Sequence, residues 1–383
     1  MNAIVFGTNH NNTLGLVWSL HEANHHIVLL LKEKGKGYVS ASRYVEKIYH
    51  CVDDNKLVDT IKQISNSLNE KPVVFVSGDA EATILNDHYQ ELSPFCFFEG
   101  GKSDGSINKY RDKDTGNELA KKCGFALPKN VVLETVQELS EIQIQYPIFI
   151  KANNSIHGGK VAMKKCDTQQ EAKLFVESMP DDYFPLQVQE FIDKEYEIMI
   201  LGCSLYGGKK VICPVANRKI RQYPKHVGLG SYSESIAVKS QTALMGLGAK
   251  ISQYLKEIEY TGLFSAEFLF SKGIYYFLEI NLRNDGTSWL STCSGYNLPD
   301  MVCRSFVDNN VNDENCSFTK RHYMNVLADF HFVRSGDVGM IDWLKQFNKN
   351  TCYSHYNPKD KHPAFAYYLG IIKSKMKKIM IIE

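Results

Sequence analysis

Four polar residues carry the clearest chemistry of this chain: Glu267, Glu279, Asn281 and Arg283. Two carboxylates and an amide offer hard oxygen ligands, which suit Mg²⁺ when the phosphates of a nucleotide complete its octahedral shell. An arginine beside such a cation could stabilise negative charge on a phosphoryl group during its transfer. The residue types therefore indicate a divalent-cation site with a phosphate ligand, provided that the chain brings these side chains together.

A β-hairpin is the element that must position them. The pattern predicts one strand at residues 263–270 and a second at 274–283, because apolar and polar side chains alternate and therefore sort onto two faces. A hairpin centred on Gly273 places Glu267 directly opposite Glu279. Two facing carboxylates repel each other unless a cation lies between them. The alternative is an ordinary surface hairpin with a polar outer face.

Composition sets the broad class of the chain. It has 383 residues, a formal net charge of +1 and 44% apolar residues, which allows two or three domains and gives no sign of nucleic-acid binding. No apolar run approaches the roughly 18 residues of a membrane helix, and the N-terminus lacks the pattern of a signal peptide. Ten cysteines without a C-x-x-C pair favour reduced thiols. We therefore expect a cytoplasmic protein with no integral membrane segment.

Strand and helix signals alternate over the first part of the chain. Strands are expected at residues 3–6, 27–31 and 73–76, and helices at 14–23 and after Ser77-Gly78-Asp79. Such alternation predicts a parallel sheet that binds ligands at the carboxyl ends of its strands. The loop after the first strand lacks G-x-G-x-x-G, because Gly7 and Gly15 are eight residues apart, so a dinucleotide is disfavoured.

A second sheet is expected after a Gly/Ser-rich linker at residues 99–108. A helix over 112–123 should follow the linker and end at Gly124, which is a typical C-terminal stop signal. The next strands, which we expect to pair antiparallel, lie at residues 148–151, 161–165 and 186–192, with a covering helix at 169–178.

A glycine-bearing loop at residues 153–160 follows the strand that ends in Lys151. It is not a Walker A loop, because a strand rather than a helix follows its lysine. Gly158 and Gly159 could still let backbone N–H groups approach phosphates, and Lys151 could contact phosphate as a point charge. The alternatives are a plain hairpin turn and a lysine whose charge merely reaches solvent at a strand end.

Glu190 and Glu197 lie seven residues apart at the edge of a later strand. Carboxylates accept hydrogen bonds from an adenine amino group and from ribose hydroxyls, and the backbone of residues 191–193 could pair with the adenine edge. The alternative is that these acidic residues flank a turn and are simply solvated.

Four motifs in this order resemble those of the ATP-grasp superfamily, which includes D-alanine–D-alanine ligase, biotin carboxylase and carbamoyl phosphate synthase. The resemblance covers residues 107–300. The motifs are Asp112-Lys113 eleven residues before Gly124, Lys151 before its glycine-bearing loop, the Glu190 and Glu197 pair, and Glu267 with the run from Glu279 to Arg283.

This resemblance implies an α/β fold in which a Rossmann-like N-terminal domain with a parallel sheet precedes a two-lobed ATP-grasp domain. The implied division is 1–106 for the substrate domain, 107–192 for a small lobe with a lid loop, 193–300 for a large lobe with the metal hairpin, and 301–383 for a C-terminal extension of the large lobe.

The resemblance also implies a role for each matched residue, with ATP and Mg²⁺ as cofactors and Mn²⁺ as a substitute for Mg²⁺. Lys113 is preferred over Lys109 because of its spacing to Gly124. The implied assignments are Lys113 and Lys151 to the ATP phosphates, Gly158 and Gly159 to the lid, Glu190 and Glu197 to adenine and ribose, Phe191 and Ile192 to the adenine hinge, Glu267, Glu279 and Asn281 to magnesium, and Arg283 to the transferring phosphate. Leu282 and Ala152 stand where the family often has proline.

The implied reaction joins a carboxylic acid to an amine through an acyl phosphate and releases ADP and phosphate. The implied partners are a small carboxylic acid and an amine, either an amino acid or a cell-surface precursor, and homodimers are common in the family. Arg221 and Tyr223 would share a strand face, and arginine suits bidentate recognition of a carboxylate, so Arg221 is assigned to the substrate or the acyl phosphate. The alternative for this segment is a solvated basic loop.

Two other functions remain open for the same ATP site. One is an ATP-dependent carboxylase resembling biotin carboxylase, although the sequence has no Met-Lys-Met for biotin attachment. The other is a regulatory module that binds a nucleotide without turnover. The presence of Arg283 argues against such a module, because binding alone does not require a residue that stabilises a transferring phosphate.

Overall fold

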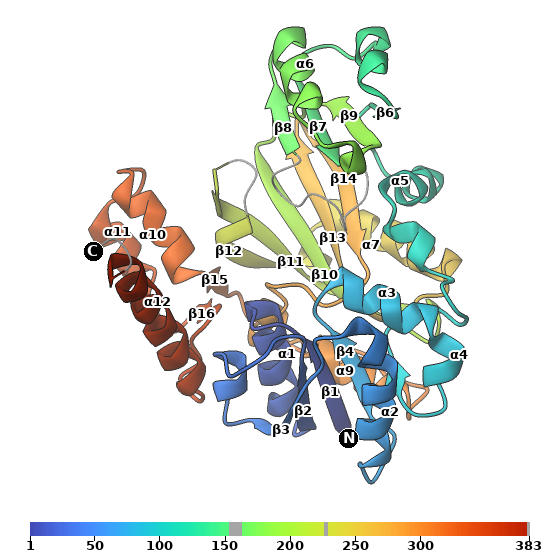
Figure 1. The fold of residues 1–383 in the computed structure, drawn as a ribbon, viewed down its shortest axis with the longest axis vertical. Helices are drawn as coiled ribbons and strands as arrows, with labels where there is room; N and C mark the ends of the chain where they lie inside the picture. Colours follow the sequence, from blue (N-terminus) through green and yellow to red (C-terminus); the bar gives the residue numbers. More distant parts are fainter. Residues whose placement is uncertain (153–162, 226–228, 381–383) are drawn as a thin grey trace.

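The computed structural model describes residues 1–152, 163–225 and 229–380. Within these residues the strands form three sheets, of five, seven and four strands, which we call the N-terminal, central and small sheets (Figure 1). In the same residues, no helix is long and apolar enough to cross a membrane. The mixture of helices with parallel and antiparallel sheets confirms the predicted α/β class.

The N-terminal sheet is parallel, as the alternating pattern predicts. Its strands, in spatial order, are β3 (Val45–His50), β2 (His26–Leu31), β1 (Asn2–Gly7), β4 (Val73–Val76) and β5 (Phe97–Phe98). Its helices are α1 (Asn11–Glu22), α2 (Leu57–Asn66), α3 (Asp79–Asp87) and α4 (Tyr89–Leu92). The sequence analysis did not identify β3, whose largely exposed edge position removes the apolar pattern of a buried strand.

Helix α1 joins the N-terminal sheet to the rest of the molecule. Its residues 12–20 are all buried, because the N-terminal sheet packs on one side while α8 (Trp289–Cys293) and α9 (Leu298–Ser305) pack on another. One continuous hydrophobic core therefore runs from the N-terminal sheet through Trp18 to residues of the central sheet such as Leu201. This shared core fixes the loops at the carboxyl ends of β1 and β4 relative to the central sheet.

The central sheet is antiparallel except for its last pair of strands. Its strands, in spatial order, are β14 (Ile274–Asn281), β13 (Gly262–Ser271), β10 (Tyr196–Leu205), β11 (Lys210–Tyr223), β12 (Leu229–Ala237), β15 (His322–Met324) and β16 (Thr351–Tyr353). Helix α7 (Thr242–Glu257) covers one face, against Phe264, Ala266 and Phe268. These are the alternating apolar positions of the predicted first hairpin strand.

The small sheet has a hydrophobic core separate from the other two. Its strands, in spatial order, are β6 (Asn130–Leu133), β9 (Leu186–Glu190), β7 (Ile148–Ala152) and β8 (Met163–Cys166), and α6 (Gln169–Glu177) covers it. Helix α5 (Lys113–Lys122) precedes this sheet. The Asp112 side chain caps its N-terminus, and Gly124 follows its end at φ 79°, so the predicted helix and its stop signal are confirmed.

The predicted linker at residues 99–108 begins with a residue that is packed into the protein rather than exposed. Glu99 is fully buried, and its carboxylate accepts hydrogen bonds from the N–H groups of Val76 in β4 (3.3 Å) and Leu263 in β13 (2.7 Å). Burial raises the pKa of Glu99 to about 8. This carboxyl group therefore fastens the N-terminal sheet to the hairpin strand β13.

The C-terminal part extends the central sheet and then crosses back to the N-terminal domain. Helices α10 (Val326–Arg334) and α11 (Met340–Lys345) lie beside β15 and β16, and α12 (His362–Met380) packs near residues 39–41 (Figure 1). Before α12, the buried Asp360 carboxylate accepts hydrogen bonds from Trp18 Nε1 (3.1 Å) and Ser42 Oγ (2.5 Å). The C-terminal segment thus contacts both the central sheet and the N-terminal domain.

Candidate active site

The hairpin pairs Glu267 with Glu279 as predicted, but its turn and its register differ from the predicted ones. Ser271 pairs with Ile274 across a two-residue turn at Lys272 (φ 49°) and Gly273 (φ 82°), so the hairpin is not centred on Gly273. A regular ladder from that turn would put residue 278 opposite Glu267. The register instead shifts next to Glu267, as in a β-bulge, and Glu267 pairs with Glu279.

A buried lysine lies between the acidic residues of this sheet. Lys219 Nζ is 3.2 Å from Glu267 Oε2 and 2.7 Å from Glu197 Oε2. Burial raises the pKa of Glu267 to about 7; Lys219 opposes this rise, whereas Glu279 and Asp285 add to it. Burial also acts to raise the pKa of Glu197, but Lys219 and Lys194 hold it below its ordinary value. The site is therefore rich in negative charge that one lysine offsets only in part.

The hairpin oxygens fit a divalent cation. In the described ranges, no group of three or more His, Cys, Asp or Glu side chains is arranged to hold a metal by itself. A cation between Glu267 and Glu279 would need the Asn281 amide and external oxygens as further ligands. The raised pKa of Glu267 supports this fit, because its cause includes a like charge directly opposite, which a cation would neutralise.

Two lysines approach this hairpin from the neighbouring elements. Lys113, the first residue of α5, donates from Nζ to the Ala152 carbonyl oxygen at 2.8 Å, which brings it next to Lys151 on β7. Burial and the charge of Lys113 lower the pKa of Lys151 to about 8, against the opposing effect of Glu279. Lys109 instead lies over the Tyr110 ring, 5.0 Å from its centroid. The lysines expected to bind phosphate thus face the acidic hairpin together.

The expected adenine and ribose residues lie at the end of β9, an inner strand of the small sheet, and near the start of β10. Glu190 ends β9, and its carboxylate accepts a hydrogen bond from the Lys129 N–H at 3.0 Å. The Phe191 N–H donates to the Pro147 carbonyl oxygen at 3.1 Å, so it is not available to a base edge. Ile192 follows in the same connection, where it is partly buried. Gly158 and Gly159 lie outside the described residues.

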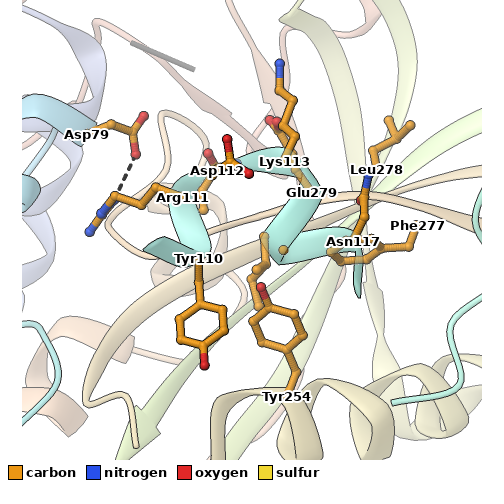
Figure 2. Close-up of a pocket in the computed structure, with 13 residues that line it drawn as sticks. Asp79, Tyr110, Arg111, Asp112, Lys113, Asn117, Tyr254, Phe277, Leu278 and Glu279 are labelled. Atoms are coloured by element: carbon orange, nitrogen blue, oxygen red, sulfur yellow. Dashed lines mark hydrogen bonds and ion pairs between the residues drawn. The ribbon is translucent and has the colours of Figure 1, made fainter. Parts of the chain in front are cut away.

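A carboxylate from the N-terminal domain connects two arginines at the other side of the hairpin. Asp79, at the start of α3, is 2.9 Å from Arg283 Nη2 and 3.1 Å from Arg111 Nη1, and Figure 2 shows the Asp79–Arg111 contact. Arg283 Nη2 also donates to Asn281 Oδ1 at 3.2 Å. Within the described chain, the buried Nε atoms of both arginines have no hydrogen-bond partner. Two guanidinium groups thus share the Asp79 carboxylate, while the negative charges of Asp285 and Glu279 also act on Arg283.

This arrangement includes residues that the sequence analysis did not assign. Asp79 had a signal, since it follows the carboxyl end of a predicted strand. Arg111 precedes Lys113 in a basic segment and lines the same small cavity as Asp79, Lys113 and Glu279 (Figure 2). Lys219 lies in the basic segment at residues 218–221, in which only Arg221 had been assigned a role.

The start of α1, just after the short connection from β1, contacts the segment that follows Arg283. Asn11 Nδ2 donates to the Gly286 carbonyl oxygen at 2.9 Å, and Asn12 Nδ2 donates to the Asn284 carbonyl oxygen at 3.0 Å. These bonds hold the segment after Arg283, including Asp285, whose negative charge acts on both Glu267 and Arg283. The polar loop that lacks a dinucleotide motif therefore has a positioning role.

The assignment of Arg221 to a substrate is wrong in this structure. Its guanidinium forms a two-pronged ion pair with the fully buried Asp329 of α10, at 2.8 and 2.6 Å. Asp329 also accepts hydrogen bonds from Ser231 Oγ and Trp343 Nε1, each at 2.8 Å. The register of β11 shifts between Lys219 and Arg221. Arg221 thus fastens α10 to the central sheet and is not available to a carboxylate ligand.

Comparison with known proteins identifies a domain family for part of the chain. Residues 118–295 match the ATP-grasp domain family. D-alanine–D-alanine ligase from Fusobacterium nucleatum is 25% identical over half of this chain and 64% of its own length. The chain therefore spans less than two thirds of that relative.

Two solved structures share the fold at low sequence identity. An L-amino acid ligase from Bacillus licheniformis superposes with a TM-score of 0.65 at 12% identity, covering 84% of this chain and 79% of that one. The biotin carboxylase domain of Hydrogenobacter thermophilus 2-oxoglutarate carboxylase, in complex with MgADP, ADP and bicarbonate, gives 0.66 at 16% identity, covering 83% and 73%. Residues 118–295 are accordingly an ATP-grasp domain.

Proposed function

We propose that this protein is an ATP-dependent carboxylate–amine ligase that forms an amide bond and releases ADP and phosphate. One observation carries the proposal: a hairpin with two facing carboxylates, Glu267 and Glu279, and a pair of arginines that share Asp79 meet at one junction between the central sheet and the N-terminal domain. Similarity to a D-alanine–D-alanine ligase and to the fold of an L-amino acid ligase supports the same reaction class.

The nucleotide would bind between the small and central sheets. Lys113 and Lys151 would contact its phosphates, since both lysines are buried beside Glu279. Glu190 and Glu197 would accept hydrogen bonds from adenine and ribose. The depressed pKa of Lys151, about 8, leaves it positively charged at neutral pH, and an arriving phosphate would hold that charge more firmly.

Glu267, Glu279 and Asn281 would hold Mg²⁺, for which Mn²⁺ could substitute. When bound, the metal would neutralise phosphate charge and align the phosphoryl group with its acceptor. Lys219 would favour the ionised form of Glu267, because its ammonium group opposes the rise in pKa that burial causes, although the pKa still stands at about 7.

The acid and the amine would meet at the arginine pair. A carboxylate oxygen of the acid attacks the γ-phosphorus of ATP, and the bond from phosphorus to the ADP oxygen breaks. The amine then attacks the acyl carbon, the bond to phosphate breaks, and the nitrogen loses a proton. Arg283 would stabilise the transferring phosphoryl group, and Arg111 would orient the acid. The spare N–H groups of both arginines support this role.

A screen of carboxylic acids crossed with amines tests the proposal. We expect phosphate release only when both are present, with the amide detected by mass spectrometry. Release with bicarbonate and no amine would instead favour the carboxylase alternative, which the shared biotin carboxylase fold supports. ATP binding without release in any mixture would favour a regulatory module.

A further inference from the structure

The last helix, α12, carries an apolar stripe that nothing in the described chain covers. Phe365 is 71% exposed, Ile372 and Met376 are each 55% exposed, and Leu369 is 37% exposed. At 100° per residue these four side chains fall within an arc of about 60° on one side of the helix. Exposed apolar residues are common singly, but a continuous stripe indicates a contact surface.

Lysines flank this stripe on both sides. Lys373 and Lys375 project about 80° to either side of the line through Phe365, and both are exposed. Between Asp360 and Glu383 the sequence contains no aspartate or glutamate, whereas it contains Lys361, Lys373, Lys375, Lys377 and Lys378. The helix is therefore amphipathic and basic, without any acidic residue to pair with its lysines internally.

The opposite side of α12 anchors the helix to the protein. Pro363 and Ala364 are buried, and the Tyr367 ring stacks on His355 with centroids 3.8 Å apart. From residue 372 to 376 every side chain is exposed, and Lys373 and Ser374 border the helix's groove against the N-terminal domain. The apolar stripe thus continues onto the part of the helix whose side chains are all exposed, where no contact within the described chain accounts for it.

A groove beside the helix is also lined by apolar residues and lysines. It runs between α12 and the N-terminal domain, and Lys36, Ile48, Leu369 and Lys373 are among its lining residues. Ile48 lies on the exposed edge strand β3 and is itself 38% exposed. Apolar residues flanked by lysines therefore extend from the helix onto the neighbouring domain.

We propose that α12 and this groove dock onto an anionic lipid surface, with the helix lying in the plane of the interface. The apolar stripe would enter the region between headgroups and acyl chains, while the flanking lysines reach the headgroup charges. Charge complementarity favours this occupant over a second copy of the chain, because two facing stripes would bring lysines of like charge together. The inference is independent of the proposed reaction.

Vesicle co-sedimentation of the full chain tests the proposal. We expect binding to vesicles of phosphatidylcholine mixed with phosphatidylglycerol, weaker binding at high salt, and little binding to phosphatidylcholine alone. Replacing Lys373→Gln and Lys375→Gln together should weaken binding about 30-fold at low ionic strength. Ile372→Ser with Met376→Ser should abolish most of it.

A matched pair on another helix provides the control. Ile341 and Leu344 of α11 are 71% and 53% exposed, so Ile341→Ser with Leu344→Ser removes similar apolar surface and should leave vesicle binding unchanged. Equal binding to both kinds of vesicle, or no binding to either, would overturn the proposal. It would also fail if sedimentation velocity showed a dimer that the α12 serine variant, but not the α11 variant, dissociates.

Discussion

The two sides of the candidate active site are built in different ways. On the cation side, Glu267 and Glu279 belong to two strands joined by a two-residue turn, so their meeting depends on local pairing. On the substrate side, Asp79, Arg111 and Arg283 come from three segments that only tertiary packing brings together. Residue spacing within a hairpin is therefore enough to bring its site residues together, whereas a site shared between domains depends on the core that joins the domains.

The largest expected effect is on the cation side. Glu279→Gln should reduce turnover roughly 100-fold or more, because an amide cannot supply the charge that binds the cation. The free energy of unfolding should change little, since the substitution removes a like charge opposite Glu267 but also a counter-charge beside the buried Lys113 and Lys151. Steady-state ADP release and thermal melting would measure both. Glu118→Gln, on an exposed position of α5, should leave turnover unchanged. Normal turnover in Glu279→Gln would remove the cation assignment.

The next effect concerns the residue that the sequence analysis misplaced. Arg221→Ala should lower the free energy of unfolding by about 3–5 kcal/mol, because it leaves the buried Asp329 carboxylate without its cation. Arg218→Ala, which breaks a pair whose arginine is substantially exposed, should cost at most about 1 kcal/mol. Urea unfolding would compare the two variants. A stable Arg221→Ala protein with impaired use of the acid substrate would return Arg221 to the active site.

A smaller effect is expected on the substrate side. Arg111→Ala should raise the KM for the acid about 10- to 100-fold with little change in the KM for ATP, since a charge-assisted contact contributes roughly 1.5–3 kcal/mol. Lys109→Ala, two residues away, should change neither constant, because Lys109 lies over Tyr110. Steady-state kinetics with each substrate varied in turn would measure this. Equal increases in both KM values would place Arg111 with the nucleotide instead.

The smallest effect is a pH dependence of the cation side. Because the folded-state pKa of Glu267, about 7, exceeds its ordinary value, stability should fall as the pH rises from about 4.5 to 7, and Glu267→Gln should flatten that slope. For the same reason Mg²⁺ must displace a proton at lower pH, so the Mg²⁺-dependent rise in Tm with ADP present should be larger near pH 8 than near pH 6. Equal rises at both pH values would show that Glu267 is already ionised.

The sequence predicted much of the fold, for identifiable reasons. The parallel N-terminal sheet, the capped helix α5 and the hairpin all follow from local patterns and were confirmed. The predicted Glu267–Glu279 pairing is correct only because a shift in register compensates for a turn that differs from the predicted one. No local sequence pattern indicates such a shift. Arg221 was misplaced because its partner, Asp329, lies after residue 300, where the patterns are mixed.

The separate core of the small sheet has a consequence for the order of events in a turnover. The N-terminal and central sheets share one core and cannot move apart without exposing it, whereas the small sheet has a core of its own, so a tilt of that sheet would leave the shared core covered. We therefore expect nucleotide exchange to follow the tilting of the small sheet, and the acid and amine to meet against two surfaces that stay fixed. In such an enzyme, ADP release would be the rate-limiting step. Selectivity among acids would come from a binding surface that is already formed before the substrates arrive.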